Sequence, residues 1–592
     1  MKKVLVGMGT CGLSAGAQGV HEKLQELVSS EPDSCELCIT GCIGMCYREP
    51  LVEIRQNGSR VIYGNVSVER AVEIFERSVR GSEVIAEYVV YKETLDAPPE
   101  GSETEFMVPQ QRIVLRNCGI IDPESLADYV DAGGYDGLRK ALLEMTPETI
   151  IEEMKASGLR GRGGAGFPTG LKWSFAAGYS GETKYVVCNA DEGDPGAFMD
   201  RSVLEGDPHS VLEGMIICAR AINAGFGYIY CRAEYPLAIK RLNIAIAAAR
   251  EKGYLGKNIL GSGFNFDVKI KQGAGAFVCG EETALFASIE GERGMPRIRP
   301  PFPAEKGLWR KPTNNNNVET YANVPWIIVN GAAEYTKFGT KQSPGTKVFA
   351  LAGKVAHGGL AEVPMGTTIN DLVFKIGGGI KGGRKFKAVQ MGGPSGGCIP
   401  SELGDTRVDF ESIPQTGAIM GSGGMVVVDD STCMVEIARF FLEFTQSESC
   451  GKCTFCRIGT LRMLEILERI TKGEGRPGDI AKLEKLSVQI KEASLCGLGQ
   501  TAPNPVLTTL RYFRHEYDAH IDERKCPAKS CEALVDFFID PEKCVGCTSC
   551  AKNCPVDAIS GEPKKVHVIN TDKCVKCSRC ITSCNFGAVY KS

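Results

Sequence analysis

Two segments in the last third of the chain repeat apolar residues at intervals of three and four. They are LRMLEILERITKGEG, residues 461–475, and IAKLEKLSVQIKEAS, residues 480–494. This spacing puts the apolar side chains on one face of an α-helix, so it predicts two helices that pack side by side. The chain begins with the short apolar run MKKVLVG, which Gly7 and Gly9 interrupt. A signal peptide needs a longer apolar core, and we therefore interpret this run as a first β-strand.

A polar, proline-containing stretch separates the first block of the chain from the rest. Residues 87–112, EYVVYKETLDAPPEGSETEFMVPQQR, have the composition of a linker or a wrapping arm. No apolar run approaches the roughly 18 residues that span a bilayer. We therefore expect a soluble protein without membrane insertion.

Length, charge and cysteine content narrow the class of protein. A chain of 592 residues is too long for one core and implies about four or five domains. With 68 basic and 72 acidic residues the net charge is -4, which provides no strong field for nucleic acid and favours small molecules and proteins as partners. Most of the 26 cysteines cluster at the short intervals of metal sites, which indicates a reducing cytoplasm.

The C-terminal tail carries two identical cysteine runs. Both follow the pattern CxxCxxCxxxC, and a pair of structural zinc sites would not need this repeat. In two-cluster ferredoxins the fourth cysteine of each run binds the other [4Fe-4S] cluster. The predicted ligand sets are Cys544, Cys547, Cys550 and Cys584 for one cluster, and Cys574, Cys577, Cys580 and Cys554 for the other.

A third [4Fe-4S] site is predicted from the triplet Cys450, Cys453 and Cys456 together with the remote Cys496. The two predicted helices lie between them and would return Cys496 to the triplet. The spacing alone also fits a zinc site with four thiolates.

Glycine-rich and amide-rich segments in the middle of the chain point to a nucleotide or flavin. Residues 157–173, SGLRGRGGAGFPTGLKW, combine glycines with Arg160, Arg162 and Lys172, which suits a phosphorylated or flat ligand, although a loop that only turns a corner looks similar. Three more segments follow: CNADEGDPGAF at 188–198, GAGAFVCGEETAL at 273–285 and NNNNVETYANVP at 314–325. Their amides suit an isoalloxazine edge. Their acids Asp194, Glu281 and Glu282 suit ribose hydroxyls and would repel a 2'-phosphate, which favours NAD over NADP.

In this order the motifs resemble the flavin-bearing, NADH-oxidising subunit of respiratory complex I. With the N-terminal block and the ferredoxin tail added, the chain is similar to the beta subunit of NAD-dependent, electron-bifurcating iron hydrogenases. The resemblance implies that FMN is held by Gly161, Arg162, Gly163, Gly164, Lys172, Asn189, Asp191, Glu281, Asn316 and Asn317. It implies NADH contacts at Phe167, Phe175, Asp194 and Glu282.

The fold class that follows is multidomain α/β and α+β. The resemblance also implies a ubiquitin-like β-grasp (SLBB) segment, with which KVFALAGKV, the GGPSGG turn and GMVVVDD agree. The expected regions are a thioredoxin-like [2Fe-2S] domain at 1–86, a linker and arm at 87–140, an FMN and NADH binding α/β core at 141–340, the β-grasp segment at 341–430, a helical [4Fe-4S] bundle at 431–519, a candidate zinc hinge at 520–535 and a two-cluster ferredoxin domain at 536–592.

The N-terminal block resembles thioredoxin-like [2Fe-2S] domains, whose pattern is a CxxxxC pair followed by TGCxGxC. TGCIGMC supplies Cys42 and Cys46, and Cys11 is present, but Val6 occupies the position of the other cysteine. We expect Cys38 as the fourth ligand, with Cys35 as the alternative; a further alternative is a domain that has lost its cluster.

One more metal site is predicted from His520, Cys526 and Cys531, with Cys433 as a candidate fourth ligand. One nitrogen and three thiolates suit tetrahedral zinc. The alternative is a surface connection in which these residues are unrelated.

The cofactor set implies an electron-transfer enzyme. NADH donates hydride and iron-sulfur clusters accept single electrons, so a flavin must stand between them, and no side-chain acid or base is required. The chain lacks the cysteine motifs of hydrogenase active-site clusters. We therefore predict an NAD(H)-oxidoreductase subunit. Its expected partners are a hydrogenase catalytic subunit and a small [2Fe-2S] subunit, and it is expected to exchange electrons with ferredoxin. The resemblance implies electron bifurcation. The alternatives are the same module in a formate dehydrogenase, a transhydrogenase or a complex-I-like enzyme, and a non-enzymatic relay arm.

Overall fold

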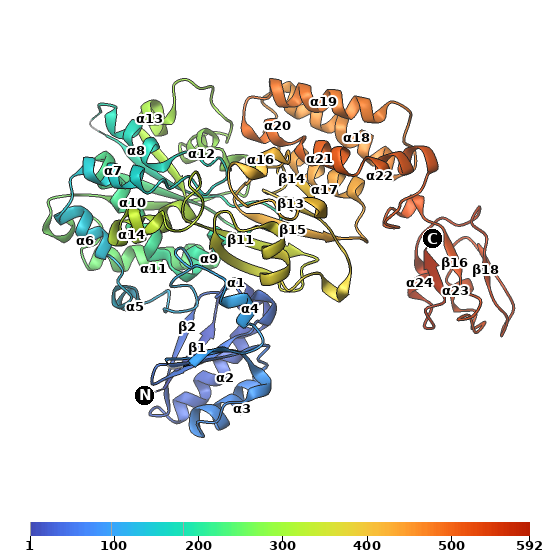
Figure 1. Cartoon of the computed structure of the whole chain (residues 1–592), viewed down its shortest axis with the longest axis horizontal. Coiled ribbons are helices and arrows are strands. Elements are labelled where there is room, and N and C mark those ends of the chain that lie inside the picture. The colour runs from blue at the N-terminus through green and yellow to red at the C-terminus, as the bar shows by residue number, and fades with distance from the viewer. Residues whose placement is uncertain (1, 96, 182, 592) are drawn as a thin grey trace. The chain divides into compact units, whose positions relative to one another are not determined.

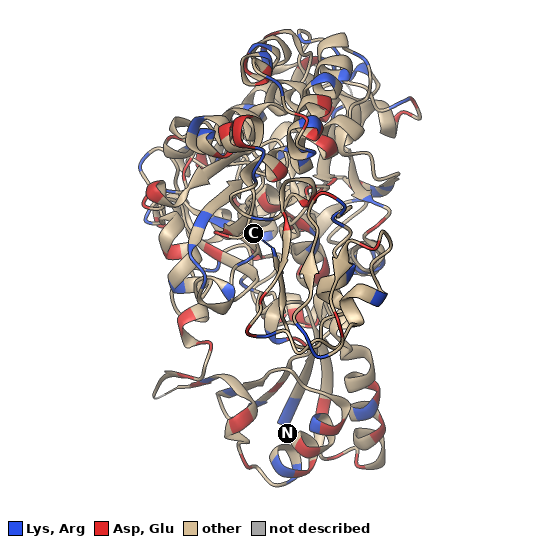
Figure 2. Cartoon of the chain, turned by 90° about the vertical axis from the view of Figure 1, so that its right-hand side faces the viewer, with Lys and Arg blue, Asp and Glu red and all other residues tan. Residues whose placement is uncertain are grey.

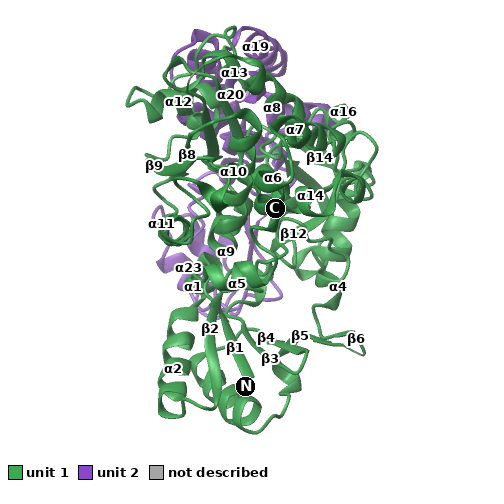
Figure 3. Cartoon of the chain, turned by 90° about the vertical axis from the view of Figure 1, so that its left-hand side faces the viewer, with its two compact units in different colours: residues 1–427, 495–498 green, residues 428–494, 499–592 purple. Residues whose placement is uncertain are grey.

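The computed structural model describes residues 2–95, 97–181 and 183–591, so the outermost bounds of the first and last predicted domains, residues 1 and 592, lie outside the described residues. The chain divides into two compact units (Figure 3). The first comprises Met1–Val427 and Leu495–Leu498, and the second comprises Val428–Ser494 and Gly499–Ser592. Acidic and basic residues are interspersed along the ribbon (Figure 2), in keeping with the small net charge.

The first unit begins with a six-stranded sheet of order β2-β1-β3-β4-β5-β6. Strand β1 runs parallel to β2 and antiparallel to β3, which confirms the predicted first strand. Helix α2 (Ala17–Ser30) covers the sheet with Ala17, Val20 and Leu24 buried, the spacing of one helical face. The strands are β1 (Lys2–Gly7), β2 (Cys35–Thr40), β3 (Val52–Gln56), β4 (Ser59–Tyr63), β5 (Val89–Thr94) and β6 (Ala97–Glu100).

The same unit contains a four-stranded parallel sheet of order β10-β7-β8-β9, and the helices that pack around it are labelled in Figure 1. Parallel strands need coverage on both faces, and the main covering helices are α10 (Pro208–Ile222), which is buried almost all round, α14 (Val318–Asn330) and α11 (Pro236–Glu251). The strands are β7 (Tyr185–Ala190), β8 (Phe226–Arg232), β9 (Asp267–Gly273) and β10 (Thr313–Asn317). Further helices are α5 (Leu126–Asp131), α6 (Asp136–Leu143), α7 (Pro147–Ala156), α8 (Thr169–Gly178), α9 (Met199–Gly206) and α12 (Glu282–Ile289).

A five-stranded sheet of order β12-β11-β15-β13-β14 follows. Its strands β11 and β15 are parallel and correspond to the KVFALAG and GMVVVD runs of the sequence, and the GGPSGG turn lies between β13 and β14. The strands are β11 (Thr346–Gly353), β12 (Gly359–Pro364), β13 (Phe386–Met391), β14 (Gly397–Pro400) and β15 (Gly424–Asp429).

The second unit begins with a helical bundle. The two helices predicted from apolar spacing are present as α18 (Thr460–Thr471) and α19 (Asp479–Ala493), and they pack against each other. The inward face of α18 includes Met463, Leu467 and Ile470, which are all fully buried. The other helices of the bundle are α17 (Met434–Ser447), α21 (Asn504–Tyr512) and α22 (Arg514–Asp518).

The tail forms two short antiparallel strand pairs, with a one-turn helix inside each cysteine run. Strand β16 (Phe537–Ile539) pairs with β19 (Val589–Lys591), and β17 (Ile559–Ser560) pairs with β18 (Val568–Ile569). The one-turn helices are α23 (Ser549–Lys552) and α24 (Arg579–Thr582). Across the part of the chain that the structure describes, no helix combines the length and apolar character needed to cross a bilayer.

Candidate functional site

The predicted flavin residues gather at the carboxyl edge of the central parallel sheet. Asn189 lies at the end of β7 just before Ala190, Arg232 ends β8, and Asn316 and Asn317 end β10. Carboxyl ends of parallel strands meet at one edge, which is where open α/β sheets bind ligands. The topology therefore brings together polar residues that are far apart in the sequence.

The glycine-rich segment forms a closed loop at this edge, before α8. Gly161 N donates to Phe167 O at 2.9 Å, and Thr169 N donates to Leu159 O at 2.9 Å. A Cβ at Gly163 would lie 3.0 Å from the Cβ of Asn317, and Gly164 has a φ of +119°, a conformation that favours glycine. The loop backbone thus lies close to the end of β10. We call the space between them the glycine cradle, and side chains added at Gly163 or Gly164 would fill it.

Hydrogen bonds fix the orientation of the site amides. Asn189 Nδ2 donates to Gly280 O at 2.8 Å, and Asn316 Oδ1 accepts from Trp173 Nε1 at 2.9 Å. Asn317 donates to the buried carboxylate of Asp200. Burial raises the pKa of Asp200 well above its usual value, an effect that the carboxylates around it reinforce. Asp200 is a contributor that sequence inspection missed, because it lies in a helix outside every recognised motif.

Several buried polar atoms near this edge have no protein partner among the described residues. They include Arg232 Nη1 and Asn315 Oδ1. A buried polar group without a hydrogen bond costs about 1–3 kcal/mol, so such groups are usually reserved for a ligand or a water. The loop after β7 packs closely against Arg232, since a Cβ at Gly193 would lie 2.1 Å from its Nη1. A guanidinium and an amide oxygen fit the polar edge or phosphate of a flavin nucleotide.

The side chain of Arg162, a predicted FMN contact, points into the protein. Its side chain is fully buried, and its guanidinium donates to Thr346 O, Pro344 O and Tyr335 Oη at 2.8–3.1 Å. These contacts tie the glycine-rich loop to the start of β11. The Arg162 side chain therefore stabilises the loop, and only its backbone remains to contact a ligand.

Two of the predicted acids, Glu281 and Glu282, lie beside cations. Lys172 Nζ lies 2.9 Å from Glu282 Oε2, and Arg299 Nη1 lies 2.9 Å from Glu282 Oε1. Burial opposes the charge of Glu282, but Lys172 and Arg299 outweigh it and hold the pKa of Glu282 below its usual value. Glu281 accepts from the backbone of Thr283 and so caps α12. Sequence inspection missed Arg299, whose only signal was its place in the basic RIRPP run.

Asp194 is a buried acid that lies beside a glycine turn. Burial raises the pKa of Asp194 to about 7, while a hydrogen bond from Ser422 Oγ at 3.0 Å favours its charged form. A Cβ at Gly393 would lie 2.7 Å from the Asp194 carboxyl. This acid titrates near neutral pH, in contrast to Glu282.

Two aromatic side chains are exposed beside the loop. Phe167 is 47% and Phe175 48% exposed, and their ring centroids are 6.5 Å apart. A pair of large exposed aromatic rings offers a surface that a flat ligand or a partner can cover. Their placement fits the predicted stacking on a nicotinamide nucleotide.

Three of the predicted N-terminal ligands converge. The Sγ atoms of Cys11, Cys42 and Cys46 lie within 4.8 Å of one another, and those of Cys42 and Cys46 are 3.6 Å apart. Hydrogen bonds with Cys11 and Cys46 hold the pKa of Cys42 well below its usual value. A thiolate is the form that binds a metal.

The structure places Cys38 and Cys35 away from this group. Both lie on β2, and neither belongs to the set of converging thiols found among the described residues. The Sγ of Cys38 faces Glu36 at 3.5 Å, and Cys35 is buried in the core of the sheet. The physical reason is register: Cys38 pairs with Leu5 in mid-strand, whereas Cys42 and Cys46 lie beyond the end of β2.

The cysteine triplet lies shortly before α18. Cys456 is buried, and a Cβ at Gly499 would lie 3.1 Å from the Cβ of Cys456. Gly499 follows Cys496 by three residues, but Cys496 itself belongs to Leu495–Leu498, which groups with the first unit. The ligation of one cluster by the triplet and Cys496 stays a prediction.

The tail contains two small cavities, each lined by four cysteines. One cavity is lined by Cys554, Cys574, Cys577 and Cys580 among other residues. The other is lined by Cys544, Cys547, Cys550 and Cys584 among other residues. The fourth cysteine of each run thus lies with the opposite run, which is the grouping that the sequence predicts. Four thiols around one cavity fit a [4Fe-4S] cluster.

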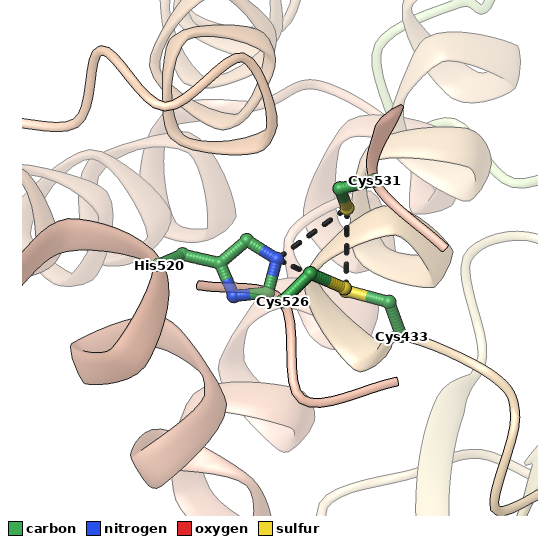
Figure 4. Close-up of side chains that lie close together, drawn as sticks. All are labelled: Cys433, His520, Cys526 and Cys531. Atoms are coloured by element: carbon green, nitrogen blue, oxygen red, sulfur yellow. Dashed lines mark hydrogen bonds between the residues drawn. The ribbon is translucent and has the colours of Figure 1, made fainter. Parts of the chain in front are cut away.

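His520, Cys433, Cys526 and Cys531 form a second buried metal-type cluster (Figure 4). His520 Nε2 lies 3.4 Å from the Sγ atoms of both Cys433 and Cys531, and these sulfurs are 3.7 Å apart. Ligands on one tetrahedral zinc are separated by about 3.5–3.8 Å. His520 Nδ1 contacts the carbonyl of Glu516 at 2.7 Å, the orienting contact typical of a histidine ligand. Hydrogen bonds with Cys433 and Cys531 hold the pKa of Cys526 far below its usual range.

Three sequence families match successive parts of the chain. Residues 154–326 match the Nuo51 FMN-binding domain, residues 436–520 the NADH-ubiquinone oxidoreductase-F iron-sulfur binding region, and residues 537–589 the 4Fe-4S dicluster domain. The last two matches cover the cysteine triplet and both cysteine runs of the tail.

Similar proteins include two curated relatives. The NADP-reducing hydrogenase subunit HndC of Solidesulfovibrio fructosivorans is 59% identical over 458 residues, which cover 77% of this chain and 93% of the relative. An NADH-quinone oxidoreductase subunit of Rhizobium meliloti is 50% identical over 415 residues, which cover 70% of this chain and 99% of the relative. Among solved structures, an NAD+-reducing [NiFe]-hydrogenase in the H2-reduced state aligns with a TM-score of 0.62 and 30% identity over 88% of this chain and 84% of that chain.

Proposed function

Because the chain belongs to the family of FMN-bearing, NADH-oxidising subunits of complex I and hydrogenases, we propose that it serves a hydrogenase complex. It is an NADH-oxidising FMN and iron-sulfur subunit of the hydrogenase or complex I type. In the proposed complex it exchanges hydride with NADH and single electrons with a catalytic subunit. The observation that carries this proposal is the carboxyl edge of the parallel sheet, where a glycine cradle accompanies the unpartnered Arg232 Nη1 and Asn315 Oδ1.

The residues at this edge fit FMN. We assign the flavin to the cradle of Gly161, Gly163 and Gly164, with Asn189 and Asn317 at its polar edge. Bound FMN accepts hydride from NADH and releases electrons one at a time. The chain supplies binding and alignment, because its own hydrogen bonds brace the loop and orient the amides before the ligand arrives. The wider proposed set adds Arg162 through its backbone, Lys172, Asp191, Glu281 and Asn316.

Phe167 and Phe175 offer exposed rings for the nicotinamide nucleotide, with Asp194 and Glu282 assigned to its hydroxyls. We propose NADH as the preferred donor. One relative bears the name of an NADP-reducing hydrogenase subunit, and in this chain Lys172 and Arg299 neutralise Glu282. Because two cations balance the charge of Glu282, a substitution of Glu282 should change the preference between NADH and NADPH.

We propose four iron-sulfur clusters and one zinc. The [4Fe-4S] clusters are assigned to the triplet with Cys496 and to the two cysteine sets of the tail, and a [2Fe-2S] cluster is assigned to the N-terminal thiols. Zinc is assigned to His520 and its three cysteines. Because zinc has no redox chemistry, its role is to tie the start of α17 to the segment that leads into the tail.

The finer architecture and assembly belong to the same proposal. We assign a thioredoxin-like fold to the N-terminal sheet and a β-grasp fold to the five-stranded sheet. The N-terminal sheet extends past residue 86, because β5 and β6 belong to it and lie in the stretch expected to be a linker. The other domain bounds are those that the sequence indicates. The proposed setting is a cytoplasmic hetero-oligomer with a hydrogenase catalytic subunit and a small [2Fe-2S] subunit. Bifurcation would divide electrons between that catalytic subunit and ferredoxin. The alternative is an equivalent subunit of a formate dehydrogenase or transhydrogenase, in which the same residues would bind FMN, NADH and the clusters.

Anaerobic addition of NADH to the purified chain tests the function. We expect stoichiometric NADH to bleach the flavin absorbance. Gly164→Ala should lose FMN because its φ of +119° disfavours a side chain. Gly178→Ala is the matched control, because a Cβ there meets nothing within 4 Å. Wild-type protein that lacks flavin, or whose flavin is unchanged by NADH, would contradict the proposal.

A further inference from the structure

A buried carboxylate contacts one of the three converging thiols in the N-terminal block. Glu49 follows the turn that begins at Cys46, and it is 7% exposed. Its Oε1 lies 3.5 Å from Cys11 Sγ, and its Oε2 accepts from Leu51 N at 2.9 Å. One carboxylate oxygen is therefore held by the backbone, while the other faces the thiols.

The position of Val6 explains why another residue is needed. The side chain of Val6 is apolar and cannot bind a metal. It is fully buried in the core of the N-terminal sheet. Cys38 and Cys35 lie elsewhere on β2. Among the described residues, Glu49 is the remaining side chain with a metal-binding atom in contact with Cys11.

Two of the separations match pairs of ligands on tetrahedral metal ions. With metal–sulfur bonds of about 2.3 Å and metal–oxygen bonds of about 2.0 Å, two sulfurs on one ion lie about 3.8 Å apart, and a sulfur and an oxygen about 3.5 Å. The observed separations are 3.6 Å between Cys42 Sγ and Cys46 Sγ, and 3.5 Å between Cys11 Sγ and Glu49 Oε1. Each of these two separations fits two ligands on one ion, and Cys11 Sγ also lies within 4.8 Å of the Sγ atoms of Cys42 and Cys46.

We propose that Glu49 is the fourth ligand of the N-terminal [2Fe-2S] cluster, with Cys42 and Cys46 on one iron and Cys11 and Glu49 on the other. This inference deepens the proposed function, on which it rests, by naming a ligand that the cysteine pattern does not supply. Glu49 binds through Oε1 alone, because the Leu51 amide holds Oε2.

The surroundings of Glu49 call for a positive partner. Among the described residues Glu49 forms no ion pair, although a buried charge is costly unless a cation or a metal compensates it. Glycines make room for the carboxylate: a Cβ at Gly7 or at Gly12 would lie 3.1 Å from Oε2. A bound iron would supply the missing positive charge.

Iron content and electron paramagnetic resonance of the full chain test this ligand. The protein is reconstituted anaerobically with iron and sulfide, and dithionite-reduced samples are recorded at a temperature where only [2Fe-2S] signals stay narrow. Wild type should hold about 14 iron atoms from its four clusters. Glu49→Ala should lose about two of them and the [2Fe-2S] signal. Glu49→Cys should restore both, with g-values shifted by the all-thiolate ligand set.

The controls use a second carboxylate–thiol pair in the same block. Glu36 Oε1 also lies 3.5 Å from a thiol, that of Cys38, but outside the converging group. Glu36→Ala and Cys38→Ser should therefore keep all the iron and an unchanged signal. Retention of flavin and of about 12 iron atoms in Glu49→Ala would show that the rest of the chain is folded.

Three results would overturn the proposal: a wild type with about 12 iron atoms, an unchanged signal in Glu49→Ala, or loss of the signal in Cys38→Ser. Flavin bleaching by NADH is recorded on the same samples. If NADH does not bleach the flavin of the wild type, the proposed function is contradicted, while the iron content still tests Glu49 as a ligand. If NADH still bleaches the flavin of Glu49→Ala, the loss of the cluster is independent of the flavin function.

Discussion

Lys172 and Glu282 form an ion pair in which Nζ lies 2.9 Å from Oε2. The family resemblance assigns Lys172 to FMN and Glu282 to NADH, so the pair links the two proposed ligand sites. Arg299 contacts the other oxygen of the same carboxylate at 2.9 Å. Removing the negative charge would therefore leave two cations beside the nucleotide.

Nucleotide choice should respond to this charge balance. In Glu282→Gln, the freed Lys172 and Arg299 should attract a 2'-phosphate, and we expect kcat/KM for NADPH relative to NADH to rise about tenfold, or about 1.4 kcal/mol. Steady-state diaphorase assays with both nucleotides measure the ratio. Glu292→Gln is the control, since that carboxylate is exposed and 3.9 Å from Arg297. An unchanged ratio in Glu282→Gln would show that Glu282 does not discriminate between a 2'-hydroxyl and a 2'-phosphate on the nucleotide's ribose.

Asp194 should make nucleotide binding depend on pH. Its pKa in the folded protein is about 7, so the carboxyl is mostly neutral at pH 6 and mostly charged at pH 8. A charged carboxylate is the stronger acceptor for a ribose hydroxyl, and we expect the affinity of the oxidised protein for NAD+ to increase about three- to tenfold from pH 6 to 8. Anaerobic titrations measure this Kd. Asp194→Asn, which is neutral throughout, should flatten the profile, and equal pH dependence in both proteins would argue against this contact.

Zinc content should depend on His520. We expect about one zinc per wild-type chain, almost none in His520→Ala or Cys526→Ser, and a lower Tm for the second unit, because a tetrahedral site loses its closure with one ligand. Metal analysis after gentle purification measures this. His515→Ala is the control, since His515 is exposed and lies five residues before His520. Zinc retained by His520→Ala would refute the site.

The crossed cysteine sets of the tail predict non-additive losses of iron. A variant with Cys574, Cys577 and Cys580 changed to serine should lose one cluster. Adding Cys554→Ser should then remove no further iron, because Cys554 lines the same cavity. Adding Cys584→Ser instead should destabilise the remaining cluster, whose cavity Cys584 lines. Equal losses from the two additions would mean that each run serves its own cluster.

Much of the secondary structure and of the metal chemistry can be predicted because the signals are local. The spacing of Met463, Leu467 and Ile470 defines one face of α18 whatever surrounds it, and these residues are buried as predicted. The cysteine runs likewise form compact turns. Prediction is weaker where a side chain can point two ways: a glycine-rich loop suggests that Arg162 contacts a phosphate, yet its guanidinium is used inside the protein.

The sequence by itself determined that the chain has FMN-binding and [4Fe-4S]-binding domains, because residue type and short spacing limit which atoms a turn can bring together. Only the tertiary structure decided which distant residues share a site. Lys172 meets Glu282 and Arg299, and Cys11 meets Glu49 rather than Cys38, because strand register and loop packing set these neighbours. No local pattern carries that information, since a contact between residues far apart depends on how the elements between them pack.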